Sequence, residues 1–415
     1  MFRVAPGARL HLPIEEDYSS GVHTRSHSML ILTLAAMVAI HPVPLLSAPS
    51  EEITVSLITI LPGPSLYAAF GHSAIRIVDR QNGTDRLYNY GISVHPFDAR
   101  FALGMLTGHM EFMVAALDTQ ESFAFYRDVE NRTIIEQVLN LDSAQIETLI
   151  STLKHDIRPE NRIYNYRYFS DNCATRVWDL LAPFCTSPDA EDAAQHNTSL
   201  RDQLYQAMID NPWLRTGIDL LLGPAADKPR PPDAPLFLPK QLLDTAAASS
   251  VVGHPEQIPF VQSSSVVYQA QKAPPPALRI PPLAISLLIL AISLVSLFPH
   301  IGKRMLVFDC ALFALAIIAG TSILLFWLAA GYPEVGFNLN LLWANPLPLA
   351  ALIVSRRSPQ SKASRALSAM TAALAFLSVA GGGLGLQHIP VELSLLALAI
   401  GVRCYSVYVR GKVLK

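Results

Sequence analysis

Residues 71–78 read Gly71-His72-Ser73-Ala74-Ile75-Arg76-Ile77-Val78, a histidine that leads directly into a strand-like run. β-Branched residues dominate the run from Ala74, and its length suits a strand of a packed sheet. About a hundred residues later, the stretch Asp171-Asn172-Cys173-Ala174-Thr175-Arg176 is typical of the start of a helix. Together they predict a mixed α/β domain with a histidine on a strand and a cysteine on a helix.

Further elements are predicted between and beside these two stretches. Residues 53–60 and 133–141 are also rich in β-branched residues at strand length. Asp142 can cap a helix, and Gln145 can reach back to the cap. Apolar residues then recur at helical spacing, which gives that helix one face to bury.

A cysteine in the first turn of a helix predicts a reactive thiol. The expected helix covers residues 173–181 and ends before Pro183. Its unpaired N–H groups and its dipole would lower the pKa of the Cys173 thiol. A histidine from a neighbouring strand would complete a thiolate–imidazolium pair, and the same N–H groups could stabilise an oxyanion.

Other interpretations of these residues stay open. Cys173 and Cys185 could form a disulfide in an oxidising compartment, and His72 could be a structural or surface histidine. The sequence shows no Cys/His cluster with zinc spacing, no phosphate-binding glycine loop and no Gly-x-Ser-x-Gly elbow. We therefore expect neither a metal nor a cofactor.

Charge divides the chain into two parts. Of the 415 residues, 51% are hydrophobic and only 15% are charged, with a mean hydropathy of +0.32, whereas soluble domains carry about 25% charged residues. Residues 277–415 hold eleven Lys or Arg and three Asp or Glu, a local charge of +8, and the first 276 residues have a local charge of −10. This pattern excludes a single water-soluble globule, a disordered chain and a general nucleic-acid binder.

The basic part contains five apolar runs, at residues 283–299, 305–330, 339–354, 366–387 and 389–402. A spanning helix needs about 20 apolar residues, so the third and fifth runs are short. Two of the four connections carry basic residues, which are Lys303 and Arg304, then Arg356, Arg357, Lys362 and Arg365, and a third basic group follows the fifth run, with Arg403, Arg410, Lys412 and Lys415. The other two connections have none, so the positive-inside rule places the acidic part outside the cytoplasm.

Four segments follow from these patterns. Residues 1–48 are interpreted as an N-terminal extension and a secretion signal, either cleaved or kept as a signal anchor. Residues 49–250 form an extracytoplasmic domain, in which the six prolines of 223–239 predict an extended strap. Residues 251–282 are a polar, Pro-containing linker, and 283–415 form a transmembrane domain of about five helices.

Three groups of residues, taken in order, resemble the Lnb-type lipoprotein N-acyltransferases. The groups are Phe70-Gly71-His72-Ser73-Ala74-Ile75-Arg76 with Tyr88-Asn89-Tyr90-Gly91; Pro159-Glu160-Asn161-Arg162, Tyr164, Tyr166 and Asp171-Asn172-Cys173-Ala174-Thr175-Arg176; and Asp219-Leu220-Leu221-Leu222-Gly223 with Phe237-Leu238-Pro239. The resemblance covers residues 53–250, and a multi-span tail also fits this family. It implies an α+β fold with a circularly permuted papain-like (NlpC-like) core, followed by an all-α transmembrane domain.

The resemblance implies that Cys173 is the nucleophile and His72 the base. A third group should orient the imidazole, as in catalytic triads generally. Asn89, on the strand expected after the His72 strand, is our candidate, with ordinary strand packing as the alternative. The candidate substrate-binding residues are Arg76, Tyr88, Tyr90, Asn172, Arg176, Asn340 and Trp343.

These binding candidates have different grounds. Arg76 and Arg176 could meet a phospholipid headgroup, whereas Asn172 could serve only as a helix cap. Asn340 and Trp343 begin the third apolar run on its outer side, where they could seat a lipid or lipoprotein. A tryptophan at a membrane interface is also a common anchor.

The implied reaction moves an acyl chain from a phospholipid, through a Cys thioester, to the α-amine of a diacylglyceryl-cysteine lipoprotein. The implied location is the bacterial inner membrane, crossed several times, with the catalytic domain in the periplasm. Both substrates lie in a bilayer, so a membrane anchor would concentrate them at the site. Two alternatives remain: a papain-like peptidase or amidase acting on cell-wall peptides, and a non-catalytic membrane sensor or scaffold.

Overall fold

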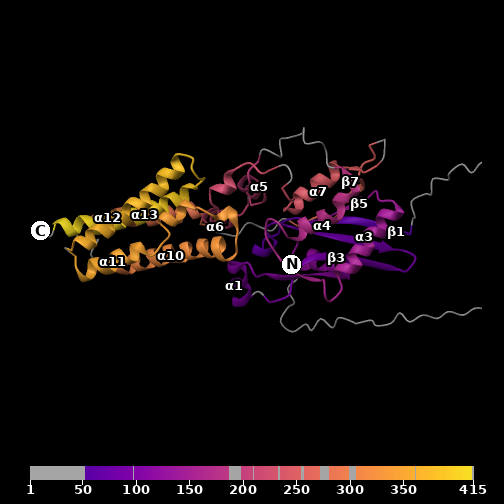
Figure 1. Cartoon of the computed structure of the whole chain (residues 1–415), viewed down its shortest axis with the longest axis horizontal. Helices are drawn as coiled ribbons and strands as arrows, with labels where there is room; N and C mark the ends of the chain where they lie inside the picture. Colours follow the sequence, from indigo (N-terminus) through magenta and orange to yellow (C-terminus); the bar gives the residue numbers. More distant parts are fainter. Residues whose placement is uncertain are drawn as a thin grey trace, which may run out of the picture.

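A sheet-containing domain and a helical domain follow each other along the long axis of the molecule (Figure 1). The computed structural model describes residues 52–96, 98–186, 198–208, 210–231, 234–253, 257–271, 280–298, 305–359 and 361–413. The predicted N-terminal extension and signal, residues 1–48, lie outside the described residues. The predicted class, an α+β domain followed by an all-α domain, is confirmed.

The first domain is built on a seven-stranded sheet in which every neighbouring pair is antiparallel. Its order is β6 (Ile163–Asn165), β4 (Glu111–Asp118), β3 (Thr84–Ser93), β2 (His72–Asp79), β1 (Ile53–Ile60), β5 (Ile134–Leu139) and β9 (Val261–Tyr268). The predicted strand at 53–60 is confirmed, and β2 begins two residues before Ala74 because His72 pairs with Ile60. His72 is therefore part of the sheet.

Helices cover both faces of this sheet. On one face lie α3 (Ser143–Asp156), α4 (Cys173–Leu181) and α7 (Pro239–Ala248), whose apolar residues share a core with Leu57 and Ile75. The predicted capping box at Asp142 and the predicted bounds of α4 are both present. On the other face, α2 (Thr119–Ala124) and a π-helical turn (Phe125–Val129) pack against the alternate strand residues.

The smaller elements connect these layers. They are a 3-10 turn (Leu66–Ala68), α1 (Ala99–Thr107), a 3-10 turn (Ala182–Phe184), the short pair β7 (Cys185–Thr186) and β8 (Ser250–Val251), α5 (Leu200–Ala207), α6 (Pro212–Leu221) and a 3-10 turn (Pro224–Asp227). Helix α1 leaves the sheet and packs against the end of the helical domain that lies nearest the sheet domain (Figure 1). The two domains are thus in contact through α1 as well as being joined by the chain between them.

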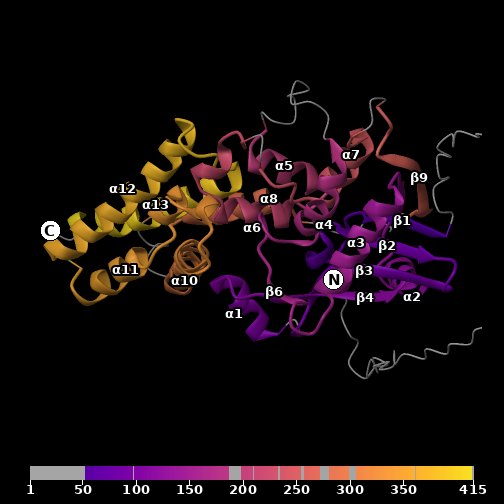
Figure 2. The same cartoon turned by 45° about the vertical axis from the view of Figure 1, so that its right-hand side comes forward.

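Two predicted irregular stretches contain regular elements. The tract predicted as a linker includes β9, which pairs with β5 at the sheet edge shown in Figure 2. Its run of consecutive polar residues, Gln262 to Ser265, concealed this strand, because an edge strand can expose both faces to water. The proline-rich stretch 223–239 is extended only in part: it begins with the 3-10 turn, and Pro239 starts α7, as proline often does in the first helical turn.

The helical domain follows the five apolar runs. It consists of α8 (Pro282–Val295), α10 (Leu306–Leu324) continued by a π-helical turn (Leu325–Ala329), α11 (Leu347–Arg357), α12 (Lys362–Gly383) and α13 (Val391–Val413). Within the described part of the chain, the helices at Leu306–Ala329 and Lys362–Gly383 are long and apolar enough to span a bilayer by themselves, and α8 is a shorter apolar helix. The third run is helical only from Leu347, because short 3-10 turns (Pro333–Val335 and Leu339–Leu342) precede it.

Basic residues gather at the end of the helices that lies away from the sheet domain. Arg356 and Arg357 end α11, and Lys362 begins α12, whereas Lys303 and Arg304 lie outside the described residues. Arg403 differs from its prediction: it lies inside α13, not after the last helix, and pairs with Asp309 of α10 at 2.6 Å. A charge among apolar helices needs such a partner, which allows α13 to continue past it.

Candidate active site

Cys173 is the first residue of α4, and a complete cap precedes it. The side-chain oxygen of Asn172 accepts the N–H of Ala174 at 2.8 Å and that of Thr175 at 3.0 Å. The Asn172 amide donates to the carbonyls of Tyr168 and Phe237. Asn172 therefore holds the helix start and the strap in place, and its contact with substrate stays a prediction.

The sulfur of Cys173 lies against the first residues of β2. The backbone N–H groups of Ser73 and of Cys173 itself face the sulfur and act to lower its pKa. Gly91 of β3, with a φ of +95°, makes room beside it: a Cβ there would lie 3.6 Å from the Cys173 Cβ. The structure thus brings the thiol to the backbone that carries His72.

His72 and Asn89 are bonded to each other in the buried interior. The His72 Nε2 lies 3.1 Å from the Asn89 side-chain oxygen, and the Asn89 amide donates to the Leu87 carbonyl at 3.1 Å. Asn89 is fully buried, and His72 is 5% exposed. With Nε2 donating to Asn89, the other ring nitrogen, Nδ1, is the one available as a base.

Burial favours the neutral form of His72 and the neutral form of Cys173. It lowers the pKa of His72 well below the ordinary 6.5, the positive charge of Arg132 lowers it further, and the bond to Asn89 opposes this. Burial raises the pKa of Cys173 above the ordinary 9.0, although the Ser73 N–H acts in the other direction. The helix start was predicted to lower the pKa of the Cys173 thiol. Burial outweighs that effect, because the thiol is only 7% exposed and desolvation penalises a thiolate.

Sequence reasoning missed a buried ion pair beside this site. Arg132 and Glu130 pair at 2.7 Å, and the Arg132 guanidinium lies over the Tyr126 ring at 5.6 Å. That ring in turn lies 6.2 Å from the His72 ring. Isolated charged residues in a turn carry no sequence signal for such a position.

The remaining predicted residues of the sheet domain make contacts within the protein. Arg76 pairs with Asp85 and Glu136, and Arg176 pairs with Asp171. The Tyr90 hydroxyl donates to Asp156, and Tyr88 is buried in the core. Their binding roles stay predictions, and none of these contacts supports them.

Asn340 and Trp343 lie at the junction of the two domains. Asn340 is fully buried, donates to the Leu220 carbonyl at 3.2 Å and accepts the Trp343 indole N–H at 3.0 Å. Asn338 donates to the carbonyls of Leu220 and Leu221. Asn340 and Trp343 thus contribute to the contact between the two domains, and their role in seating a lipid or lipoprotein stays a prediction.

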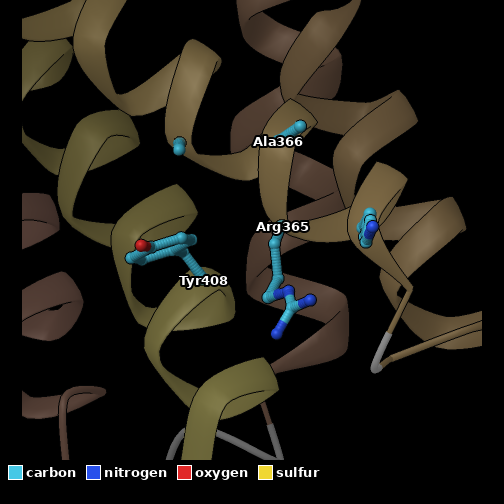
Figure 3. A pocket seen from close by; sticks show the side chains of 5 residues that line it. Arg365, Ala366 and Tyr408 are labelled. Carbon is cyan, nitrogen blue, oxygen red and sulfur yellow. The ribbon is translucent and has the colours of Figure 1, made fainter.

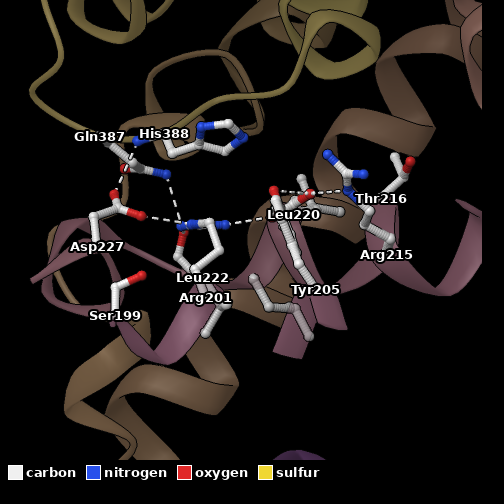
Figure 4. A network of polar contacts seen from close by, with 12 residues as sticks. Ser199, Arg201, Tyr205, Arg215, Thr216, Leu220, Leu222, Asp227, Gln387 and His388 are labelled. Atoms are coloured by element: carbon white, nitrogen blue, oxygen red, sulfur yellow. Dashed lines mark hydrogen bonds and ion pairs between the residues drawn. The ribbon is translucent and has the colours of Figure 1, made fainter. Parts of the chain in front are cut away.

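A polar network continues the junction on the side of the sheet domain (Figure 4). Arg201 pairs with Asp219 and Asp227 and donates to the Leu222 carbonyl. Gln387, in the turn before α13, donates to the same carbonyl at 3.0 Å. Residues 219–223 of the third family-like group therefore join the domains, whereas Phe237 of the same group lies against the cap of the cysteine helix.

A hollow on the helical domain lies outside this site. An open hollow of about 320 Å³ is lined by residues from the start of α12 and the end of α13, namely Lys362, Arg365, Ala366, Ala369 and Tyr408 (Figure 3). It is at the far end of the helical domain from Cys173. No group of three His, Cys, Asp or Glu side chains that could hold a metal is found in the described part of the chain, and Cys173 and Cys185 are free thiols.

Comparison with known protein families gives two matches. The model of the Lnb N-terminal periplasmic domain matches residues 45–207, and the model of the Lnb transmembrane domain matches residues 276–412. No curated protein and no solved structure matches the chain. The matches follow the same order as the two observed domains, and the chain therefore belongs to the Lnb family of lipoprotein N-acyltransferase-like proteins, which anchor a periplasmic domain in the membrane.

Proposed function

We propose that the protein is a thiol-dependent lipoprotein N-acyltransferase of the bacterial inner membrane, crossed several times by its helical domain. Two observations support this proposal: the Cys173 sulfur faces the Ser73 backbone, next in the chain to His72, and the His72 ring is hydrogen-bonded to Asn89. A cysteine at a helix start with a base oriented by a third group is the arrangement used for acyl transfer. The attachment of this domain to membrane helices suits substrates that lie in a bilayer.

The first half-reaction uses a phospholipid as acyl donor. His72 Nδ1 takes the thiol proton while Sγ attacks the ester carbonyl carbon, giving a tetrahedral intermediate. The C–O bond then breaks, and the proton passes from His72 to the leaving oxygen. The products are a Cys173 thioester and a lysophospholipid.

The second half-reaction uses the α-amine of a diacylglyceryl-cysteine lipoprotein. The amine attacks the thioester carbonyl and gives a proton to His72, and the C–S bond breaks. His72 returns that proton to the sulfur, so the free thiol is restored and the lipoprotein carries an amide-linked acyl chain. No cofactor takes part in either half-reaction.

Complementation tests this function. In a strain lacking its own lipoprotein N-acyltransferase, the chain should restore N-acylated lipoproteins, measured by mass spectrometry of their N-terminal peptides. Cys173→Ser should abolish this, whereas Cys185→Ser should not, because Cys185 is equally buried but lies at the start of β7. N-acylation by Cys173→Ser would disprove the thioester mechanism, and altered muropeptides without N-acylation would indicate a cell-wall peptidase.

A further inference from the structure

The intermediate of either half-reaction places a negative charge on the former carbonyl oxygen, which needs hydrogen-bond donors. The start of α4 provides fewer than a bare helix end would. Asn172 already accepts the N–H groups of Ala174 and Thr175. The N–H of Cys173 itself is then the donor of this turn that the Asn172 side chain leaves available, and it lies beside the sulfur. Oxyanion sites generally combine two or more donors, so a second one is needed.

Tyr164 carries a hydroxyl in a suitable place. Its oxygen is buried and has no hydrogen-bond partner among the described residues. A Cβ built on Gly91 would lie 3.9 Å from this oxygen and 3.6 Å from the Cys173 Cβ. The hydroxyl and the cysteine therefore face the same small space, which Gly91 leaves open. A buried polar atom without a partner is costly and often marks a functional position.

The Tyr164 ring is held firmly. Tyr164 lies in β6 opposite Phe112 of β4, and the Arg176 guanidinium stacks on its ring at 3.6 Å. Arg176 is held in turn by Asp171 at the start of the cysteine helix. Burial, above all, keeps the pKa of Tyr164 well above 10.0, so the hydroxyl retains its proton at neutral pH.

We propose that Tyr164 is a further catalytic residue, which donates its hydroxyl hydrogen bond to the oxyanion alongside the Cys173 N–H. This inference rests on the proposed function, since it assigns a role in the same acyl transfer. The carbonyl electron pair moves onto oxygen as Sγ or the amine attacks, and it returns when the C–O or C–S bond breaks. Tyr164 keeps its proton throughout and serves both half-reactions.

The test compares Tyr164→Phe with Tyr268→Phe in the purified full-length protein. Tyr268 is a matched control because it lies on the edge strand β9, where its hydroxyl donates a hydrogen bond to Asn131. Two rates are measured: lysophospholipid release from a phospholipid in mixed micelles, and alkylation of Cys173 by iodoacetamide, which forms no oxyanion. Tyr164→Phe should lower release about 10²- to 10³-fold and leave alkylation and thermal stability unchanged, because no hydrogen bond of the folded protein is lost.

Two results would overturn this role. One is a release rate in Tyr164→Phe equal to that of Tyr268→Phe. The other is a fall in alkylation that matches the fall in release, which would mean that the hydroxyl only positions the thiol. Failure of the proposed function has a different signature, since the wild-type protein would then release no lysophospholipid and N-acylate no lipoprotein.

Discussion

Two buried polar clusters of the protein differ in how completely their atoms are paired. At the domain junction, both polar atoms of the Asn338 side chain and of the Gln387 side chain have hydrogen-bond partners. At the thiol site, the hydroxyls of Ser73 and Tyr164 have none within the described residues. The two clusters are comparably buried, so burial does not explain the difference.

The comparison shows how structural and chemical roles can be told apart. A paired buried group stabilises one arrangement, and it has no remaining capacity for a ligand. An unpaired one costs stability and keeps its hydrogen bond for something absent from the resting protein. By this criterion we expect the junction to hold the thiol domain on the membrane helices, and we expect substrate atoms to complete the pairing at the proposed site.

The largest effect on stability is expected from breaking the junction. Asp219→Ala removes one of the two carboxylates that pair with the buried Arg201 and leaves it Asp227, so unfolding free energy should fall by about 3 kcal/mol. Asp244→Ala is the matched control, because its ion pair with Lys240 is exposed and contributes about 0–1 kcal/mol. Thermal unfolding in detergent measures both, and equal shifts would contradict the structural role of the junction.

A smaller effect on stability, together with a loss of activity, is expected from Asn89→Ala, because it removes a buried side chain with two hydrogen bonds. Loss of the bond to His72 lets the imidazole turn, which should lower the acyl-transfer rate about 10²-fold. The bond also raises the pKa of His72, so the acid limb of the pH–rate profile, already below pH 6.5, should move to lower pH. Asn82→Ala, in an exposed turn, is the control, and an unmoved acid limb would exclude the orienting role.

The smallest effect is expected from Asn340→Ala. It removes one donor to Leu220 and the acceptor for Trp343, which should lower unfolding free energy by about 1–3 kcal/mol. The KM for phospholipid should stay unchanged, since Asn340 is fully buried. A raised KM at unchanged stability would restore the predicted role in seating lipid.

Local patterns allowed much of the fold to be predicted. The capping box at Asp142, the bounds of α4 and the five apolar runs depend on interactions within a few residues of each other. Edge strand β9 was missed, since its consecutive polar residues resemble a linker until β5 lies beside it. Arg403 was misplaced for the same reason, because its partner Asp309 is on another helix.

The chain's own order of residues was enough to show a thiol at a helix start, a histidine on a strand, and an acidic domain ahead of a basic-ended membrane domain. Capping, periodicity and charge placement act between residues close together in the chain, so they can be recognised in the sequence. Contacts between distant segments decided the protonation of Cys173 and His72 and the partners of Asn172 and Asn340. They also left the Tyr164 hydroxyl without a hydrogen-bond partner among the described residues. Such contacts set desolvation and hydrogen-bond capacity, and only folding brings them about.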